Sequence, residues 1–377
     1  MKFRKIALGA VMAAIIFTGC NNTTGNDDKE QTPSPTATAS QKPVENDKNK
    51  DTSVQGTIAE FFPFKENAAY VYERSDALGL SSTYPVYIEG SKMQRATKAG
   101  EWLVTEVFEN SGGELTVNYA HNSSSGFENF MGMKDEYQIT VLKEPLQLGG
   151  SWETYSGPTV QGVAKGVCTI TDVGVEVETP YGKVSAIEVS TELENGYTNV
   201  DYYAKGIGLV KSGYFIKGFE SATSTAEDVN TDLVLKSFEE NSPYEVDFLV
   251  CFPNENADGL EETAVNYEYN TNGDLQAILE EALKNPTGNP NNKVISENTK
   301  INFVDVTWQS SKDPETNAYK ETAAVHVDLS HNFVDDMNAG SGYEQLLLQS
   351  LEATLKGFYN AIDFTLTIDG EAYVSRH

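Results

Sequence analysis

Apolar and polar residues alternate along most of the chain between residues 57 and 225. This two-residue period predicts strands with one buried face, because successive strand side chains point to opposite sides. Residues 101–108 and 115–119 follow it on either side of Gly112-Gly113, which predicts a hairpin. The pattern continues at residues 167–170, 173–177 and 184–189, with a turn at Pro180-Tyr181-Gly182. We therefore expect an all-β antiparallel domain over residues 56–225, built as a curved sheet or half-barrel.

The pattern changes after Tyr244. Residues 246–252 form a nearly continuous apolar run, which is typical of a central strand. An apolar stripe from Leu275 to Leu283 has helical spacing, and Asn285-Pro286 ends that helix. Residues 301–308 predict another strand, in which a phase slip at Phe303-Val304 indicates a bulge.

The end of the chain predicts a strand, a helix and a strand. Residues 325–329 alternate apolar and polar, and Ser341 stands three residues before Glu344, which is the spacing of a capping box. An apolar stripe from Leu347 to Phe358 has helical spacing. Residues 362–368 alternate again and end at the turn dipeptide Asp369-Gly370.

These C-terminal elements occur in the order β-α-β-β-α-β. That order predicts an α+β domain over residues 244–377, with a four-stranded sheet and two helices on one face. The preceding residues 226–243 are acidic and weakly patterned, so we expect a linker with one short helix near Leu233. Pro243 marks its end.

Residues 1–20 form a processing segment. They combine a basic start, an apolar run from Ile6 to Phe17 that is too short to span a bilayer, and a closing Cys20. The ending Phe17-Thr18-Gly19-Cys20 resembles a bacterial lipobox, in which the cysteine receives a diacylglyceryl group and becomes the mature N-terminus. The resemblance implies a lipoprotein signal peptide, lipid attachment (palmitate) at Cys20 and anchoring to the membrane. An ordinary secretory signal with an incidental cysteine is the alternative.

Residues 21–55 contain almost no large apolar side chain. Such a composition cannot bury enough surface to offset the loss of chain entropy, so we expect a disordered tether with a mean reach of roughly 30–35 Å. The two remaining cysteines, Cys168 and Cys251, fall in different predicted domains. We expect two buried free thiols rather than a disulfide.

The formal net charge is -29 and the pI is near 4.4. This balance argues against nucleic acid as a partner, because binding phosphates requires a cationic surface. It also disfavours a polybasic contact with anionic lipid. A strongly acidic surface suits a solvated protein on the extracellular face of the cell membrane.

Several motifs are spaced between residues 244 and 372: Phe252-Pro253, the helix ending at Pro286, Val327-Asp328-Leu329-Ser330 with Phe333, Gly340-Ser341 with Glu344, Thr354-Leu355 and Ile368-Asp369-Gly370. Together they resemble the GerMN domain, the sporulation and spore-germination domain of Gram-positive bacteria. The chain departs from the family at Asn285-Pro286, where Gly-Pro is usual, and at residues 309–321, which exceed the usual hairpin turn.

The resemblance implies a fold similar to the ring-building motif of sporulation channel proteins, a membrane-tethered setting and a scaffolding role. It implies no catalytic residues and no cofactor. The motif residues with an implied structural or docking role are Asp328, Ser330, Gly340, Ser341, Glu344, Asp369 and Gly370. Residues 145–152 and 202–211 also resemble a β-domain of bacterial lipoproteins that has no agreed activity.

Two groups of residues imitate chemical sites. Asp328, Ser330 and His331 suggest a catalytic triad, but His331 would point away from the strand face that the other two share. Asp328 and Ser330 are better explained as residues that end the strand and hydrogen-bond local backbone. Residues 254–259 imitate a calcium loop, yet Val265 occupies the position where a bidentate glutamate is needed, so a polar turn is the better interpretation. We expect no metal site. His326 shares the Asp328 side of its strand and is more typical of a surface residue than of a ligand.

Two functions remain. The first is a non-enzymatic envelope lipoprotein that docks protein partners through a sheet edge or helix face, in sporulation or germination. The second is an extracytoplasmic binding protein that holds a cell-wall fragment, sugar or lipid on the concave face of the β-domain. A packed sheet interior would favour the first, and aromatics converging in an open one the second.

Overall fold

The computed structural model of this protein describes residues 53, 55–122, 125–157, 163–216, 230–289, 291–312, 319–337 and 341–374. The predicted signal peptide, the lipid attachment site Cys20 and nearly all of the predicted tether lie outside these residues. Gly340 lies outside them as well.

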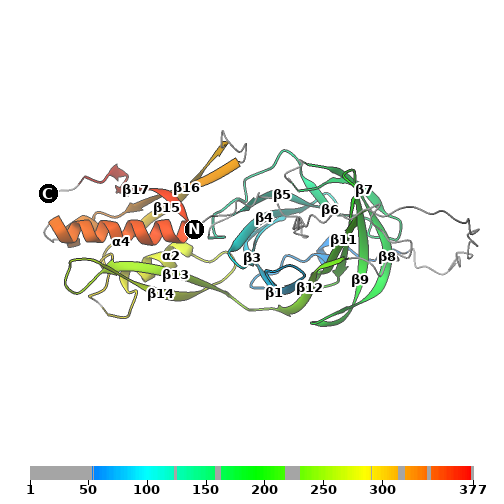
Figure 1. Cartoon of the computed structure of the whole chain (residues 1–377), viewed down its shortest axis with the longest axis horizontal. Helices are drawn as coiled ribbons and strands as arrows, with labels where there is room; N and C mark the ends of the chain where they lie inside the picture. The colour runs from blue at the N-terminus through cyan, green and yellow to red at the C-terminus, as the bar shows by residue number, and fades with distance from the viewer. Residues whose placement is uncertain are drawn as a thin grey trace, which may run out of the picture.

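A curved sheet of twelve antiparallel strands forms the first region, as Figure 1 shows on the right. Each strand pairs with its neighbours in the order β6-β5-β4-β3-β2-β1-β12-β11-β10-β9-β8-β7. The strands span Ala69–Arg74, Leu80–Glu89, Lys92–Ala99, Trp102–Ser111, Glu114–Asn122, Ile139–Lys143, Ser151–Tyr155, Lys165–Thr179, Gly182–Leu193, Tyr197–Ala204, Gly208–Ile216 and Asn230–Glu239 for β1 to β12. The predicted half-barrel is confirmed.

Local sequence explains the details of this sheet. Gly112 and Gly113, between β4 and β5, both have positive φ (63° and 78°), as the predicted tight hairpin turn requires. The two strands expected within residues 167–177 are one long strand, β8. It carries bulges at Thr171 and Gly174, where its register with β9 skips a residue.

The half-barrel closes on itself at β6 and β7, the two ends of the sheet. The Trp152 indole N–H and the Thr154 hydroxyl, both on β7, donate to the Thr140 carbonyl of β6 at 3.0 Å each. Side chains thus join the two edges where no backbone ladder does. We call this junction the seam.

The prediction of a linker over residues 226–243 is partly wrong. Residues 230–239 form β12, which pairs with β1 on one side and with β11 on the other. Leu233 and Leu235 are buried there, and neither the linker nor the short helix near Leu233 exists over this stretch. Acidic neighbours obscured the strand pattern, and the partner strand β1 lies about 160 residues earlier, so no local signal announced the pairing.

The second region contains the hairpin β13–β14 (Tyr244–Pro253, Leu260–Tyr269) and a four-stranded sheet, β15–β16–β17–β18. That sheet spans Ile301–Lys312, Tyr319–Leu329, Ala361–Ile368 and Glu371–Ala372, and only its β16–β17 pair is parallel. The helices are α2 (Leu275–Lys284), α3 (Asn332–Met337) and α4 (Ser341–Tyr359). Residues 375–377 lie outside the description.

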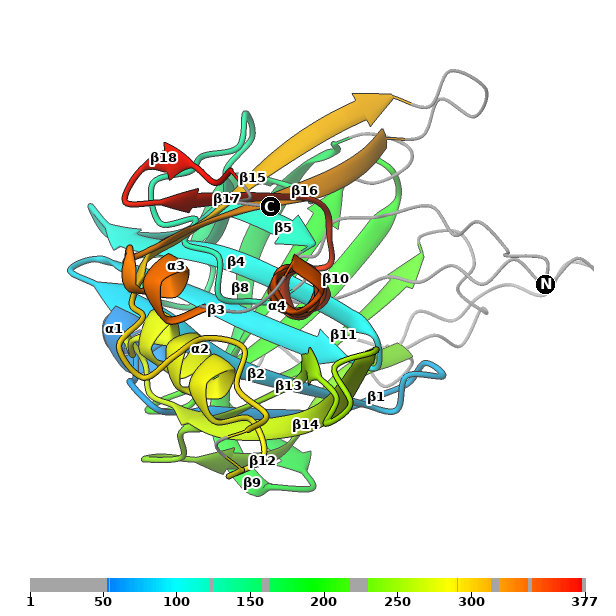
Figure 2. The same cartoon turned by 90° about the vertical axis from the view of Figure 1, so that its left-hand side faces the viewer.

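The predicted helices at 275–283 and 341–358 are confirmed, and so is an α+β region with a four-stranded sheet. The membership of that sheet was predicted incorrectly. The strand at 246–252 pairs with β14, which the sequence did not reveal, and β18 takes its place in the sheet. Helix α4 lies between the four-stranded sheet and the hairpin, which both views show (Figures 1 and 2).

The two regions share one hydrophobic core. Tyr84 and Phe127 of the half-barrel pack with Tyr244 of β13; the Tyr84 and Tyr244 rings stack with centroids 3.6 Å apart. The turn at Asn272 binds the backbone of β2: its N–H donates to the Val86 carbonyl at 2.9 Å, and its side-chain amide donates to the Ile88 carbonyl at 3.0 Å. These contacts hold the two regions together.

Candidate functional site

The predicted motif residue Asp328 ties three chain segments together at the end of β16. Its side chain is 3% exposed. One carboxylate oxygen accepts hydrogen bonds from the Thr367 hydroxyl at 2.5 Å and from the Gly370 N–H at 2.8 Å. The other accepts from the Asn302 amide at 2.8 Å. Asn302 is the extra residue of a bulge in β15, one residue before the predicted slip, and the bulge aims it at Asp328.

Burial raises the pKa of Asp328, but the hydrogen bonds from Thr367, Asn302 and the Gly370 N–H outweigh it and hold the pKa below its usual range. His326 adds a smaller effect of the same direction. It lies on the same strand face, is half-buried, and places its Nε2 2.9 Å from the Thr367 hydroxyl oxygen. Because Thr367 donates to Asp328, its oxygen accepts from His326.

The remaining motif residues also position backbone. The Ser330 hydroxyl accepts from the Lys300 N–H at 2.9 Å, and the Glu344 carboxylate accepts from the Tyr373 hydroxyl. Asp369 lies in the turn after β17, with φ at 49°. Asp328 and Ser330 thus bind groups of remote segments, not the local backbone that the sequence analysis expected. Ser341 opens α4; its predicted capping box with Glu344 involves a side chain that is not described.

Neither the triad-like group near His331 nor the calcium-like loop at 254–259 forms a chemical site. His331 is exposed just before α3, and its Nε2 lies 3.6 Å from the Asp335 carboxylate of that helix. The loop at 254–259 joins β13 to β14, and the Asn254 amide donates to the Asp258 carboxylate at 2.8 Å, which favours the predicted polar turn. Over the described residues, no three metal-ligating side chains gather in one place. Cys168 and Cys251 are free thiols, the first buried and the second half-buried.

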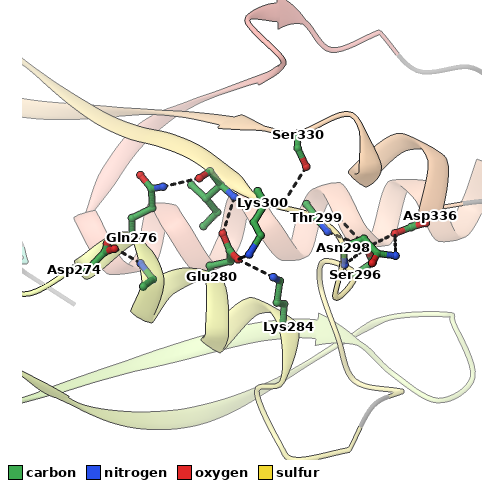
Figure 3. Close-up of polar contacts among 12 residues, drawn as sticks. Asp274, Gln276, Glu280, Lys284, Ser296, Asn298, Thr299, Lys300, Ser330 and Asp336 are labelled. Carbon is green, nitrogen blue, oxygen red and sulfur yellow. Dashed lines mark hydrogen bonds and ion pairs between the residues drawn. The ribbon is translucent and has the colours of Figure 1, made fainter.

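A polar network around Glu280 was not found from the sequence. Figure 3 shows the Glu280 carboxylate of α2 accepting from Lys284 (2.7 Å), from Lys300 (2.9 Å) and from the Ile301 N–H (3.0 Å). Burial raises the pKa of Glu280, but the lowering by these donors is larger than that increase and brings the pKa to about 2. The network fixes the start of β15, where Gln276 also donates to the Ile301 carbonyl.

Near it, a second set of contacts ties α3 to the loop before β15. Ser296 and Asn298 both donate to the Asp336 carboxylate, as Figure 3 shows. The only sequence signal for either network is the Glu280/Lys284 spacing of four residues on a helix, which is common on solvated surfaces.

The interior of the half-barrel is filled by its own side chains. The short helix α1 (Ile58–Phe61) and Phe62 enter it and bury their apolar side chains. Arg95 lies over the ring of Phe108 at 4.4 Å and forms an ion pair with Glu106 at 2.9 Å. Two cavities remain beside these groups, each about 20 Å³, which is room for roughly one water molecule apiece.

Two carboxyl groups on the strands of this sheet have raised pKa values. Burial raises the pKa of Asp201 on β10 to about 6, against a smaller lowering by the Ser212 hydroxyl. Burial also raises the pKa of Asp232 on β12 to about 6, opposed by the charge of Arg74. Both groups are therefore harder to ionise in the folded protein than a carboxyl group in water.

A larger cleft of about 470 Å³ lies between the two regions. Its walls are β13, the C-terminal part of α4 and the turn between β3 and β4. Its lining residues include Lys98, Glu101, Asp247, Leu249, Glu262 and Gly357. This volume falls within the range of about 300–1,000 Å³ that is usual for ligand sites.

Fold and motif together define the C-terminal region as an α+β module whose polar motif residues hold strand ends in place. Residues 249–374 match the model of the Germane family, described as sporulation and spore germination. The chain therefore carries a Germane domain in its C-terminal third, and the resemblance predicted from the motifs is confirmed.

No curated protein matches the sequence. One solved structure that the chain resembles comes from Parabacteroides distasonis and is described provisionally as a lipoprotein. The two share 14% identity over 48% of this chain and 98% of that chain, with a TM-score of 0.28. This TM-score is too low to relate the folds. Within the described residues, no helix is both long and apolar enough to cross a membrane.

Proposed function

We propose that this protein is a non-enzymatic envelope lipoprotein that docks partner proteins in sporulation or spore germination. The Germane domain supports the association with these processes. The lipobox-like ending at Cys20 supports anchoring by a lipid, on the extracellular face of a Gram-positive cell membrane. Docking through the folded region is the physical part of the proposal.

The observation that carries the proposal is the filled interior of the half-barrel. The seam joins its ends, and α1 with Phe62 occupies its inside. The two interior cavities are far smaller than a sugar ring or an acyl chain requires. The β-domain therefore supports the second region better than it would hold a cell-wall fragment, sugar or lipid on its concave face.

The polar motif residues also support a role without catalysis. Asp328 directs both carboxylate oxygens to groups that hold strands and turns, and Ser330 accepts from a backbone N–H. A general base needs to reach a substrate proton, and these oxygens are already engaged with the fold. The groups left to contact a partner protein are those on the surface, including strand edges in the second region.

Site-specific photocrosslinking in living cells tests the proposal. A photoreactive side chain is placed at two exposed positions of the second region, Leu260 and Ile362, and at two matched positions of the half-barrel, Val167 and Tyr181. We expect discrete protein adducts from the first pair, stronger in sporulating than in vegetative cells. The whole chain is used, because the shared core makes a deletion of the second region disruptive.

Adducts from the half-barrel positions alone, or none at any position, would contradict docking through the Germane domain. Cys20→Ala is expected to release the protein from the membrane fraction and to abolish metabolic labelling with palmitate. Retention of both would contradict the anchor while leaving the docking proposal intact.

A further inference from the structure

We infer that the cleft beside β13 binds an extended, cationic segment of a partner polypeptide as an added strand. This inference rests on the proposed docking function and names its site and the chemistry of its partner. It starts from the backbone of β13, which pairs with β14 on only one side.

The orientation of the β13 backbone follows from one contact. The Cys251 N–H donates to the Thr354 hydroxyl of α4 at 2.9 Å, so the polar backbone groups of Cys251 point away from β14. The register of β13 with β14 is unbroken. Because this direction repeats every second residue of an antiparallel strand, the N–H and C=O groups of Asp247 and Leu249 also point away from β14.

These four backbone groups are open. Among the described residues, none hydrogen-bonds to the backbone of Asp247 or Leu249. Both residues line the cleft, and the Leu249 side chain is 50% exposed. An exposed strand edge with free donors and acceptors is a template for another strand.

The opposite wall leaves room for that strand. Gly357 of α4 lines the cleft, and a Cβ atom placed on it would meet nothing within 4 Å. Thr354 covers the edge at Cys251, one turn earlier. Beyond it, Asp247 and Leu249 line the cleft. Three other edges offer less: those of β6 and β7 meet at the seam, and Gln276 and Glu280 occupy the start of β15.

Charge selects the occupant. Glu101, Asp247 and Glu262 line the cleft against one cation, Lys98. The whole chain carries a formal charge of -29, so a second copy would be repelled, whereas a basic segment would be attracted. Apolar lining residues such as Leu103 and Phe358 suit alternate side chains of the same segment.

The test uses a fluorescent synthetic peptide of alternating valine and lysine, with about the ten residues of β13. Fluorescence anisotropy measures its affinity for the whole chain in detergent. The unchanged protein is compared with two variants, Gly357→Trp and Gly342→Trp. Gly342 is a matched control, because it lies on the same helix, is exposed and equally has open space at its Cβ position, but does not line the cleft.

We expect Gly357→Trp to weaken binding by at least about tenfold, which is the loss of roughly 1.4 kcal/mol. Gly342→Trp should leave the affinity within about twofold. A peptide of the same sequence with alternate amides N-methylated should also bind at least about tenfold more weakly, because its ladder hydrogen bonds are blocked.

Equal binding of the N-methylated peptide would overturn the inference, since charge attraction alone would then explain the affinity. Equal binding to Gly357→Trp, or no binding to unchanged protein, would overturn it as well. Crosslinked partners at Leu260 and Ile362 would in those cases still support docking, through another surface. Absence of those partners would contradict the proposed function itself.

Discussion

The half-barrel and the Germane domain treat their strand edges in opposite ways. The half-barrel joins its end strands through Trp152 and Thr154 and fills its interior with its own side chains. The Germane domain splits its strands into a hairpin and a four-stranded sheet, which leaves the β13 edge open beside a cleft. The comparison teaches that a closed sheet uses up its edges within the fold, while an open edge keeps unpaired backbone groups with which another strand can pair.

The two regions also differ in how they treat carboxyl groups. Asp201 and Asp232 of the half-barrel are buried with few donors, so their pKa values rise to about 6. Glu280 and Asp328 of the Germane domain accept several hydrogen bonds, so their pKa values fall below the usual range. The contributions of these two sets of carboxyl groups to the stability of the whole protein should therefore depend on pH with opposite sign.

The largest expected effect breaks the shared core. Phe127→Ala removes a buried ring that packs on Tyr244, Tyr269 and Phe358, and should lower the free energy of unfolding by about 3–5 kcal/mol. Because the core is common, both regions should lose stability together. Urea unfolding followed by tryptophan fluorescence measures this, with the exposed Ile362→Ala as control, expected within about 0.5 kcal/mol. Two separate transitions, only one of them shifted, would show that the regions are independent.

Glu280→Gln sharpens the comparison from the Germane side. The pKa of Glu280 falls from 4.5 to about 2, so its contribution is fully present above pH 4.5 and is lost as the pH falls through about 2. We expect a loss of about 3 kcal/mol at pH 7, because the buried Lys284 also loses its partner. The more exposed pair Glu352–Lys356 provides the control: Glu352→Gln should change stability by less than about 0.5 kcal/mol. Equal losses in the two variants would show that the network has no structural role.

Asp201→Asn tests the same comparison with a carboxyl group of the half-barrel. The folded pKa of about 6 exceeds the ordinary 3.8, so stability is greatest below pH 3.8 and falls as the pH rises through about 6. The asparagine has no charge to bury, and the variant should be more stable at pH 7.5 by about 2 kcal/mol. Urea unfolding between pH 4 and pH 8 measures the slope, with the exposed Glu178→Gln as control. A variant less stable than the unchanged protein at pH 7.5 would rule out this account of Asp201.

The smallest effect concerns the seam. Trp152→Phe removes the donor to the Thr140 carbonyl with little change in shape, and Thr154 remains as a second donor. We expect a loss of about 1 kcal/mol, and a larger one when Thr154→Val is added, since the carbonyl then loses both donors. Thermal unfolding compares them with the exposed Tyr181→Phe. No loss in the double variant would mean that the seam is held by packing alone.

The sequence predicted what depends on neighbouring residues. Alternation located most strands, helical spacing located α2 and α4, and Gly112-Gly113 located a turn. It did not reveal β12, whose partner β1 is remote, nor β14, where acidic residues on an exposed face dilute the period. Strand pairing over long separations leaves little trace in a local pattern.

The candidate site, too, could be predicted only in part. Asp328 was recognised from a motif, but its partners come from two other places in the chain: Asn302 from β15, and Thr367 and Gly370 from the end of β17 and the turn after it. The cleft could not be predicted, because it depends on how β13, α4 and the β3–β4 turn meet. Open backbone groups at Asp247 and Leu249 are set by pairing, not by residue type.

Residue-resolved amide hydrogen exchange on the whole chain tests the central claim most directly. The account predicts fast exchange at Asp247 and Leu249 and slow exchange at the intervening Phe248, whose backbone faces β14. On adding the valine–lysine peptide, Asp247 and Leu249 should become protected while Phe248 stays slow. Protection of Asp247 and Leu249 in the free protein, or no change in the complex, would contradict it.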